Sequence, residues 1–452
     1  MNLKAAVLLD AWSRTLASAA DGAIFGPDGR LLRTWHDIED EACHFAGLLA
    51  SPTPSAVVLQ TGNHAGFPAA LLGAWRAGRP VVLVDAGLAA PVREQVERDI
   101  HAGTRIVAAG KDLEFLDLEN GAVTPESRAD LYKLTSGTTS RPSLLPFTAA
   151  QLLADCENVC ESMEIRATDR NFGVVAFTHS YGFSNLVTPL IARGIPLVAA
   201  TDALPRALAA GLLNSGATVL PAVPAMFRAL LTVEALPEQL RLCISAGAPL
   251  DARLAAEFHG RFGRKLHSFY GASECGGIAF DASDDPCPPT GFVGTALKGV
   301  DLGLEPSGDG VWRARVRSDA VGLTSSDGVY EPADLLEKTP RGLRLIGRDS
   351  DLINVGGRKV SPAYVEEALG HHPGVRAAVV FGVPREGGGE WVAALVVTEP
   401  GTTAADLRAH CASRLAPWER PREFHFSEKI PTNERGKISR RDLAARYAPP
   451  AL

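Results

Sequence analysis

Short apolar runs alternate with helical stretches along most of the chain, and this alternation is the strongest constraint on its fold. Residues 56–60 and 80–84 are typical of strands, and the helical stretch 68–76 connects them. Such repeats predict parallel sheets covered by helices on both faces. Ligands in these folds bind beyond the carboxyl ends of the strands, so the Gly- and Ser-rich turns should carry the chemistry. Further strands are predicted at 172–177, 196–199, 217–220 and 242–245.

The pattern changes in the C-terminal third of the chain. Between residues 290 and 330, short alternating runs such as 311–316 predict antiparallel strands. Ser361 and Pro362 suit the N-cap and the first position of a helix, and residues 377–381 are typical of a strand. We therefore expect a small α+β domain at the C-terminal end.

The composition excludes several classes of protein. The 452 residues are 46% hydrophobic and 21% charged, which is usual for soluble globular proteins, and the net charge of -7 gives no indication of nucleic-acid binding. Seven scattered cysteines favour a reducing, cytoplasmic location. Asp10 and Arg14 interrupt the Ala-rich N-terminus, which predicts an amphipathic helix rather than a signal peptide. No apolar run is long enough to span a membrane.

A Ser/Thr-rich turn around one glycine is the most informative segment: Thr135, Ser136, Gly137, Thr138 and Thr139. Backbone N–H groups exposed at glycine, together with hydroxyls, can bind phosphate oxygens. The Gly-Lys-Ser/Thr ending of a Walker loop is missing. Alone, the segment fits a phosphate site and an ordinary turn about equally well.

Polar residues further along the chain can complete a nucleotide site. Tyr270 can stack on a base, Gly271 would let the backbone approach it, and Glu274 can hold Mg²⁺. Asp334 and Arg348 are residue types that bind ribose or phosphate. Each of them, taken singly, is also explained as part of a turn or as a surface charge.

In their order, and with Lys437 on a glycine turn near the end, these segments resemble the acyl-adenylate-forming (AMP-binding) superfamily. That superfamily includes acyl- and aryl-CoA synthetases, luciferase-like enzymes and the adenylation domains of peptide synthetases. The resemblance implies an α/β fold with a large N-terminal domain, residues 1–347, of parallel sheets flanked by helices plus a small distorted barrel. It also implies a hinge at 348–350 and a mobile α+β lid domain at 351–452.

The resemblance also assigns roles to single residues. It implies that Glu274 binds Mg²⁺, that Lys437 acts in the adenylating step, and that Asp334 binds the ribose hydroxyls beside Arg348. The remaining cofactor-binding residues that it implies are Thr135, Ser136, Gly137, Thr138 and Thr139 in the phosphate loop, Gly247, Ala248, Tyr270 and Gly271 in the adenine pocket, Ser273, Gly357 in the pantetheine loop, and Lys359.

The segment 177–184 resembles the family's acyl-pocket motif, which contains a histidine. His179 is expected near the acyl group and the path of the thiol, with Ser180, Tyr181 and Ser184 also lining the substrate pocket. Without the surrounding match, a hydrogen-bonded core histidine would explain His179. Amino-acid-activating relatives carry an aspartate in this neighbourhood for the substrate ammonium, and the segment has none. A non-amino acid, aryl or of short to medium chain length, is therefore favoured.

The phosphate loop departs from the family pattern. Ser140 and Leu144 stand where relatives usually have glycine, and Ser143 stands where they have lysine. This departure keeps a non-catalytic adenylate-binding protein as one alternative.

The expected reaction uses ATP, Mg²⁺ and coenzyme A to convert a small carboxylic acid to acyl-AMP and then to a thioester. The other alternative is a stand-alone loading enzyme, which acylates the phosphopantetheine arm of a separate acyl or peptidyl carrier protein. Both acceptors present the same thiol.

Overall fold

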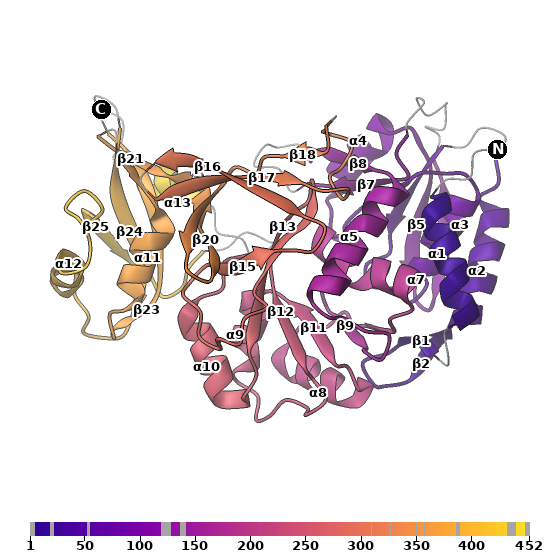
Figure 1. The fold of residues 1–452 in the computed structure, drawn as a ribbon, viewed down its shortest axis with the longest axis horizontal. Helices are drawn as coiled ribbons and strands as arrows, with labels where there is room; N and C mark the ends of the chain where they lie inside the picture. The colour runs from indigo at the N-terminus through magenta and orange to yellow at the C-terminus, as the bar shows by residue number, and fades with distance from the viewer. Residues whose placement is uncertain are drawn as a thin grey trace. The chain divides into compact units, whose positions relative to one another are not determined.

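The computed structural model describes residues 5–18, 22–51, 55–118, 128–135, 142–308, 310–325, 327–348, 351–356, 358–385, 389–431 and 440–447. It divides into two compact units (Figure 1). The first unit comprises Met1–Gly303, Arg315–Pro332 and Pro340–Leu343. The second unit comprises Leu304–Ala314, Ala333–Thr339 and Arg344–Leu452. Of the expected hinge, only Arg348 lies within the described residues.

The first unit contains a six-stranded sheet. In spatial order its strands are β6 (Asp112–Asp117), β5 (Ala102–Ala109), β3 (Ala56–Gln60), β4 (Val81–Leu83), β7 (Leu131–Leu134) and β8 (Leu144–Phe147). The four central strands run parallel, and the edge strands β6 and β8 are antiparallel to them. Every residue of β3 is buried, as expected for a parallel strand covered on both faces. This sheet confirms the predicted strands at 56–60 and 80–84.

A second sheet in the same unit carries the remaining predicted strands. Its order is β2 (Leu31–Thr34), β1 (Gly22–Phe25), β10 (Leu197–Ala199), β9 (Asn171–Gly173), β11 (Val219–Ala222), β12 (Leu242–Ser245), β13 (Leu266–Ala272), β14 (Gly276–Phe280) and β15 (Phe292–Ala296). Six neighbouring strands of this sheet run parallel to one another: β1, β10, β9, β11, β12 and β13. Strand β2 is antiparallel to β1, β14 is antiparallel to β13, and β15 is antiparallel to β14. The prediction of parallel sheets is confirmed.

Strand β9 ends at Gly173, four residues earlier than the sequence predicted. The cause is the side chain of Asn63. Its Nδ2 donates to the carbonyls of Gly173 (2.8 Å), Val175 (3.1 Å) and Ala200 (2.9 Å), and its Oδ1 accepts from the N–H of Phe177 (2.9 Å). These bonds satisfy the backbone groups that a longer strand would have paired.

Helices cover both sheets, and one buried hydrophobic cluster contains residues of both sheets and of α1, α5 and α7. Figure 1 shows α5 and α7 between the two sheets. The predicted amphipathic helix at the N-terminus is α1, which buries Leu8 and Trp12. The helices of this unit are α1 (Ala6–Ser18), α2 (Trp35–Leu48), α3 (Phe67–Arg76), α4 (Ala90–Asp99), α5 (Ala149–Ser162), α6 (Ser180–Gly182), the π-helix η1 (Phe183–Val187), α7 (Thr188–Arg193), α8 (Pro205–Ser215), α9 (Pro224–Leu230) and α10 (Ala252–Phe262).

Five strands follow: β16 (Asp301–Gly308), β17 (Val311–Arg317), β18 (Val329–Tyr330), β19 (Asp334–Thr339) and β20 (Gly342–Arg348). The antiparallel pairing of β17 with β18 confirms the antiparallel strands predicted between residues 290 and 330. Strand β17 pairs antiparallel with both β18 and β19. In the described part of the chain, no helix is both long enough and apolar enough to cross a bilayer.

The rest of the second unit is a small α+β assembly. Ser361 caps its first helix by accepting a hydrogen bond from the N–H of Tyr364, and Pro362 occupies the first turn, which confirms the predicted helix start. Strands β23 and β24 are antiparallel, and β25 joins β24 in parallel. The elements are β21 (Ile353–Val355), β22 (Arg358–Val360), α11 (Pro362–Gly370), β23 (Val375–Pro384), β24 (Glu390–Thr398), α12 (Ala404–Ala412), β25 (Glu423–Phe426) and α13 (Arg440–Tyr447).

A buried carboxylate ties together the starts of three strands in the second sheet. Asp169, only 4% exposed, accepts hydrogen bonds from Nε of Arg241 (2.8 Å), Oγ1 of Thr218 (2.8 Å) and the N–H of Arg166 (2.8 Å). Burial would raise the pKa of Asp169, but these donors together hold it below its usual value. The hydrogen bonds of ionised Asp169 therefore stabilise the fold at pH values above the pKa that Asp169 has in the unfolded state. This stabilisation is lost as the pH falls through the lower pKa of Asp169 in the folded state.

We expect Asp169→Ala to lower the free energy of unfolding at pH 7 by about 2 kcal/mol, less than for a fully buried pair because Arg241 is partly exposed. The difference from the parent protein should shrink as the pH falls below about 4. Urea denaturation at several pH values measures it, with the exposed Glu161→Gln as the control. A loss of the same size at every pH would contradict this account.

Candidate active site

The predicted adenine-pocket residues lie where the parallel pairing of β12 and β13 ends: Gly247 and Ala248 follow β12, and Tyr270 and Gly271 are in the last part of β13. Ser245, the last residue of β12, pairs in register with Ser268 of β13. Gly247 and Tyr270 lie two residues beyond these partners, so the structure brings them to the same edge of the sheet. Gly247 has a φ of +85°, which glycine adopts without a Cβ clash. The neighbouring Ala248 is exposed, as a residue lining an open site would be.

Glu274 lies in the tight turn between β13 and β14. Gly271 pairs with Gly277 across this hairpin, and the carbonyl of Glu274 accepts a hydrogen bond from the N–H of Gly322 (2.9 Å). Ser273 and Glu274 are half-buried. The described residues contain no cluster of three metal-ligating side chains. A single carboxylate nevertheless fits Mg²⁺, which commonly takes one or two carboxylates and completes its shell with waters and nucleotide phosphates.

The predicted phosphate loop leaves the carboxyl end of β7. Thr135 fixes its base, since its N–H donates to the carbonyl of Ser143 (3.0 Å) and its Oγ1 accepts from the N–H of Ser143 (3.3 Å). Ser136, Gly137, Thr138, Thr139 and Ser140 lie outside the described residues.

The predicted acyl-pocket segment lies beside the second sheet. The hydroxyl of Tyr181 donates to the carbonyl of Ile244 in β12 (2.9 Å). Burial raises the pKa of Tyr181 well above its usual value, so this phenol remains a neutral donor. His179 is exposed, and its Nε2 lies 3.5 Å from Oδ2 of Asp85, which follows β4. Ser180 has a buried hydroxyl without a hydrogen-bond partner among the described residues.

Two charged residues that the sequence analysis missed lie beside this segment. Asp155 of α5, 3% exposed, accepts from the N–H of Gly277 (2.9 Å) and from the hydroxyl of Ser184. Lys133 of β7 is 1% exposed, and its Nζ lies 4.5 Å from the centroid of the Phe147 ring.

The charges around Lys133 act on its pKa in opposite directions. Burial lowers the pKa, whereas the nearby Asp155, Cys275 and Glu274 raise it, and the net shift is downward. The sequence contained a signal for this residue, because Lys133 interrupts an apolar strand two positions before Thr135. Asp155 gave a similar signal, since it shares a helix face with Leu152.

The second unit holds the predicted ribose-binding residues. Asp334 begins β19 and is buried, and its Oδ1 accepts a hydrogen bond from Nε of Arg348 at the end of β20 (3.0 Å). The backbone of Lys359 in β22 pairs with Asn354 in β21. Gly357 and Lys437 lie outside the described residues.

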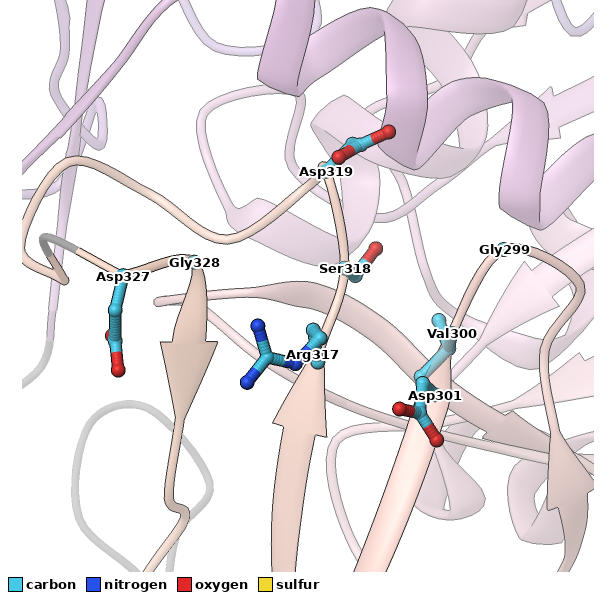
Figure 2. A pocket seen from close by; sticks show the side chains of 8 residues that line it. All are labelled: Gly299, Val300, Asp301, Arg317, Ser318, Asp319, Asp327 and Gly328. Carbon is cyan, nitrogen blue, oxygen red and sulfur yellow. The ribbon is translucent and has the colours of Figure 1, made fainter.

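A separate pocket of about 510 Å³ opens in the first unit, where β16 begins and β17 ends. Figure 2 shows the carboxylates of Asp301 and Asp327 on either side of the Arg317 guanidinium in this view. None of the predicted site residues lines this pocket. We therefore place the site at the strand edge described above.

Comparison with known protein families identifies the chain. A family model described as AMP-binding enzyme matches residues 23–309, and a model of the AMP-binding enzyme C-terminal domain matches residues 364–437. The chain belongs to the AMP-binding enzyme family. Within this family it is an enzyme of the AMP-forming acyl-CoA synthetase type.

Several relatives of this AMP-binding enzyme are CoA ligases. It is 27% identical over 387 residues to the oxalate–CoA ligase of Arabidopsis thaliana, and the aligned region covers 77% of this chain and 74% of the relative. It is 25% identical to the 4-hydroxybenzoate–CoA/benzoate–CoA ligase of Rhodopseudomonas palustris, over 96% of this chain and 92% of the relative. Its fold is shared with an anthranilate CoA ligase solved with anthranoyl-AMP, with a TM-score of 0.82, 20% identity and coverage of 98% and 97%.

We expect Asp334→Asn to weaken AMP binding by roughly tenfold, because a neutral amide accepts hydrogen bonds less strongly than a carboxylate. Calorimetric titration with AMP and with 2′-deoxy-AMP measures this loss. The parent protein should distinguish the two nucleotides, and the variant should distinguish them less. Glu337→Gln is a matched control, since Glu337 is in the same strand and pairs with Arg344. If the parent protein and the variant distinguished AMP from 2′-deoxy-AMP equally well, Asp334 would not be a ribose-binding residue.

Proposed function

We propose that this AMP-binding enzyme activates a non-amino carboxylic acid with ATP and then transfers the acyl group to the thiol of coenzyme A. The observation that carries the proposal is the convergence of Gly247, Tyr270 and Glu274 at one strand edge in the first unit. These residues match the family's adenine pocket and magnesium ligand. The site needs no general base for the first step, because the substrate carboxylate is itself a nucleophile.

In the first step, a carboxylate oxygen of the acid attacks the α-phosphorus of ATP and pyrophosphate leaves. This step requires in-line positioning and neutralisation of the phosphate charges. Mg²⁺ held by Glu274 and the phosphates would neutralise part of that charge when bound. Lys437 would add an ammonium at the α-phosphate. In the second step, a thiolate attacks the acyl carbon and AMP leaves.

The charges beside the acyl-pocket segment support a substrate without an amino group. The structure does bring an aspartate there, Asp155, but both of its oxygens already accept hydrogen bonds from Gly277 and Ser184. A substrate ammonium would also meet the positive charge of Lys133, because Asp155 and Lys133 lie within electrostatic range of each other. The relatives that act on oxalate and on benzoate fit a small acyl or aryl acid.

The relatives favour coenzyme A as the acceptor, because those named above are CoA ligases. A carrier protein presents the same phosphopantetheine thiol and is the second candidate. With ATP and a panel of acids, the enzyme should release pyrophosphate, and added CoA should become acylated. Acylation of a carrier protein but not of CoA would replace the first candidate with the second. Nucleotide binding without pyrophosphate exchange for any acid would point to the non-catalytic alternative, which the altered residues Ser140, Ser143 and Leu144 suggest.

Lys437→Ala should slow adenylation by roughly two to four orders of magnitude, comparable to losing one preorganised charge donor in a transition state. The same variant should convert synthetic acyl-AMP to thioester at nearly the parental rate. Gly357→Leu should do the reverse, by obstructing the pantetheine path while sparing pyrophosphate release. Rapid-quench assays of the two half-reactions measure both effects.

Lys429→Ala is the control for the loss of a basic side chain, because Lys429 is exposed in the same unit. It should leave both half-reactions unchanged. If Lys437→Ala slowed both half-reactions equally, or slowed neither of them, the proposal that Lys437 acts only in the adenylation step would be wrong.

A further inference from the structure

The buried carboxylate of Asp155 contacts two segments that the sequence analysis assigned to different parts of the site. Its Oδ1 accepts a hydrogen bond from the N–H of Gly277 (2.9 Å), which is three residues beyond Glu274. Its Oδ2 accepts from the hydroxyl of Ser184 in the predicted acyl-pocket segment. Burying a carboxylate is unfavourable unless such donors satisfy it, so the folded protein keeps both bonds.

Helix α5 also holds the Glu274 turn through a second side chain, one helical turn before Asp155. Nε2 of Gln151 donates to the carbonyl of Val321 (2.6 Å), and the N–H of Gly322 donates to the carbonyl of Glu274 (2.9 Å). Residues four apart lie on the same face of a helix, so Gln151 and Asp155 act from one face of α5. The backbone around Glu274 is therefore held by this helix at two points.

Gly276 makes room for the carboxylate of Asp155. Its φ of +73° is in the left-handed region, and a Cβ at this position would overlap with the Asp155 carboxylate. Glycine therefore lets the chain pass close to Asp155 and bring the N–H of Gly277 to it.

Ser184 anchors the acyl-pocket segment on the other side of Asp155. It is 3% exposed and lies in the π-helix η1, a conformation that is rare and frequent at functional sites. Its hydroxyl donates to Asp155, so this group is engaged by the protein rather than by a substrate. One carboxylate thus joins the segment expected to hold the acid to the turn expected to hold the metal.

We propose that Asp155 is a positioning residue, which holds the acyl-pocket segment and the Glu274 turn in a fixed arrangement. The proposal rests on the function proposed above, in which the acid and the magnesium-bound phosphates must meet in line. Asp155 acts through Ser184 and Gly277 and takes no part in bond formation. Hydrogen-bond partners behind a metal ligand are usually worth roughly 10- to 100-fold in metal affinity or activity.

A purely electrostatic role is the alternative, because Asp155 lies near the ammonium of Lys133. The two roles differ in what asparagine would do at this position. Its oxygen can accept from Gly277 and its amide nitrogen can donate to the hydroxyl oxygen of Ser184, so Asp155→Asn keeps both bonds and loses the charge. Asp155→Ala loses the bonds and the charge together.

The metal side is tested without turnover, by calorimetric titration with the α,β-methylene analogue of ATP in the presence and absence of Mg²⁺. The parent protein should bind the analogue more tightly with Mg²⁺, and Asp155→Ala should lose roughly tenfold of this gain. Pyrophosphate-exchange assays test the acid side, where the same variant should raise the KM for the acid by roughly tenfold. Binding of AMP without Mg²⁺ should stay near the parental value.

Asp155→Asn should restore most of both losses, whereas a role as counter-charge to Lys133 would make it as harmful as Asp155→Ala. The double variant Asp155→Asn/Lys133→Met removes both charges, so it separates a folding defect caused by an unpaired ammonium from a loss of positioning. Thermal melts check the fold of each variant. Glu161→Gln is the matched control, because Glu161 is exposed on the same helix.

Parental values in Asp155→Ala, or a loss confined to the metal side or to the acid side, would overturn the proposal. Losses in the double variant as large as those in Asp155→Ala would also overturn it, as would an equal loss of AMP binding. If the parent exchanged pyrophosphate with no acid at all, the proposed function itself would fail. The calorimetric comparison would still decide whether Asp155 supports the Glu274 turn.

Discussion

The parallel pairing of β11, β12 and β13 is the constraint on which the candidate site depends. Parallel strands in register end at the same edge, so residues at equal distances beyond Ser245 and Ser268 become neighbours although the chain separates them. The switch to antiparallel pairing after β13 then reverses the chain within a few residues and places Glu274 in that turn. A change of register by one residue would turn Tyr270 to the opposite face of the sheet.

Much of this arrangement could be predicted from the sequence. The strands 56–60 and 242–245 were predicted with their observed bounds, because buried parallel strands are continuous apolar runs bounded by turns. The Ser361 cap was also predictable from local sequence, because serine is a favoured N-cap residue and proline is favoured at the first helical position. Local sequence chemistry therefore determines these elements.

Contacts between distant residues could not be predicted in this way. Asp155 and Ser184 are 29 positions apart, and Lys133 precedes both. Their proximity depends on how α5 packs against the second sheet, which the pattern of one helix does not specify. The early end of β9 has the same origin, since the amide that causes it lies more than a hundred positions away in the chain. The contacts between buried polar residues are therefore the part of the candidate site that could not be predicted from the sequence alone.

The Asn63 side chain links the two sheets of the first unit. It follows β3 of the first sheet, and its one amide bonds backbone groups at and just after the end of β9 and just after the end of β10. An amide offers donors and an acceptor in one plane, as a peptide group does, so Asn63 replaces a missing stretch of backbone. Because this tie holds the chain as far as Phe177, the segment from His179 onward starts from a fixed point. A substitution beyond that point can therefore change the shape of this segment while the register of both sheets stays the same.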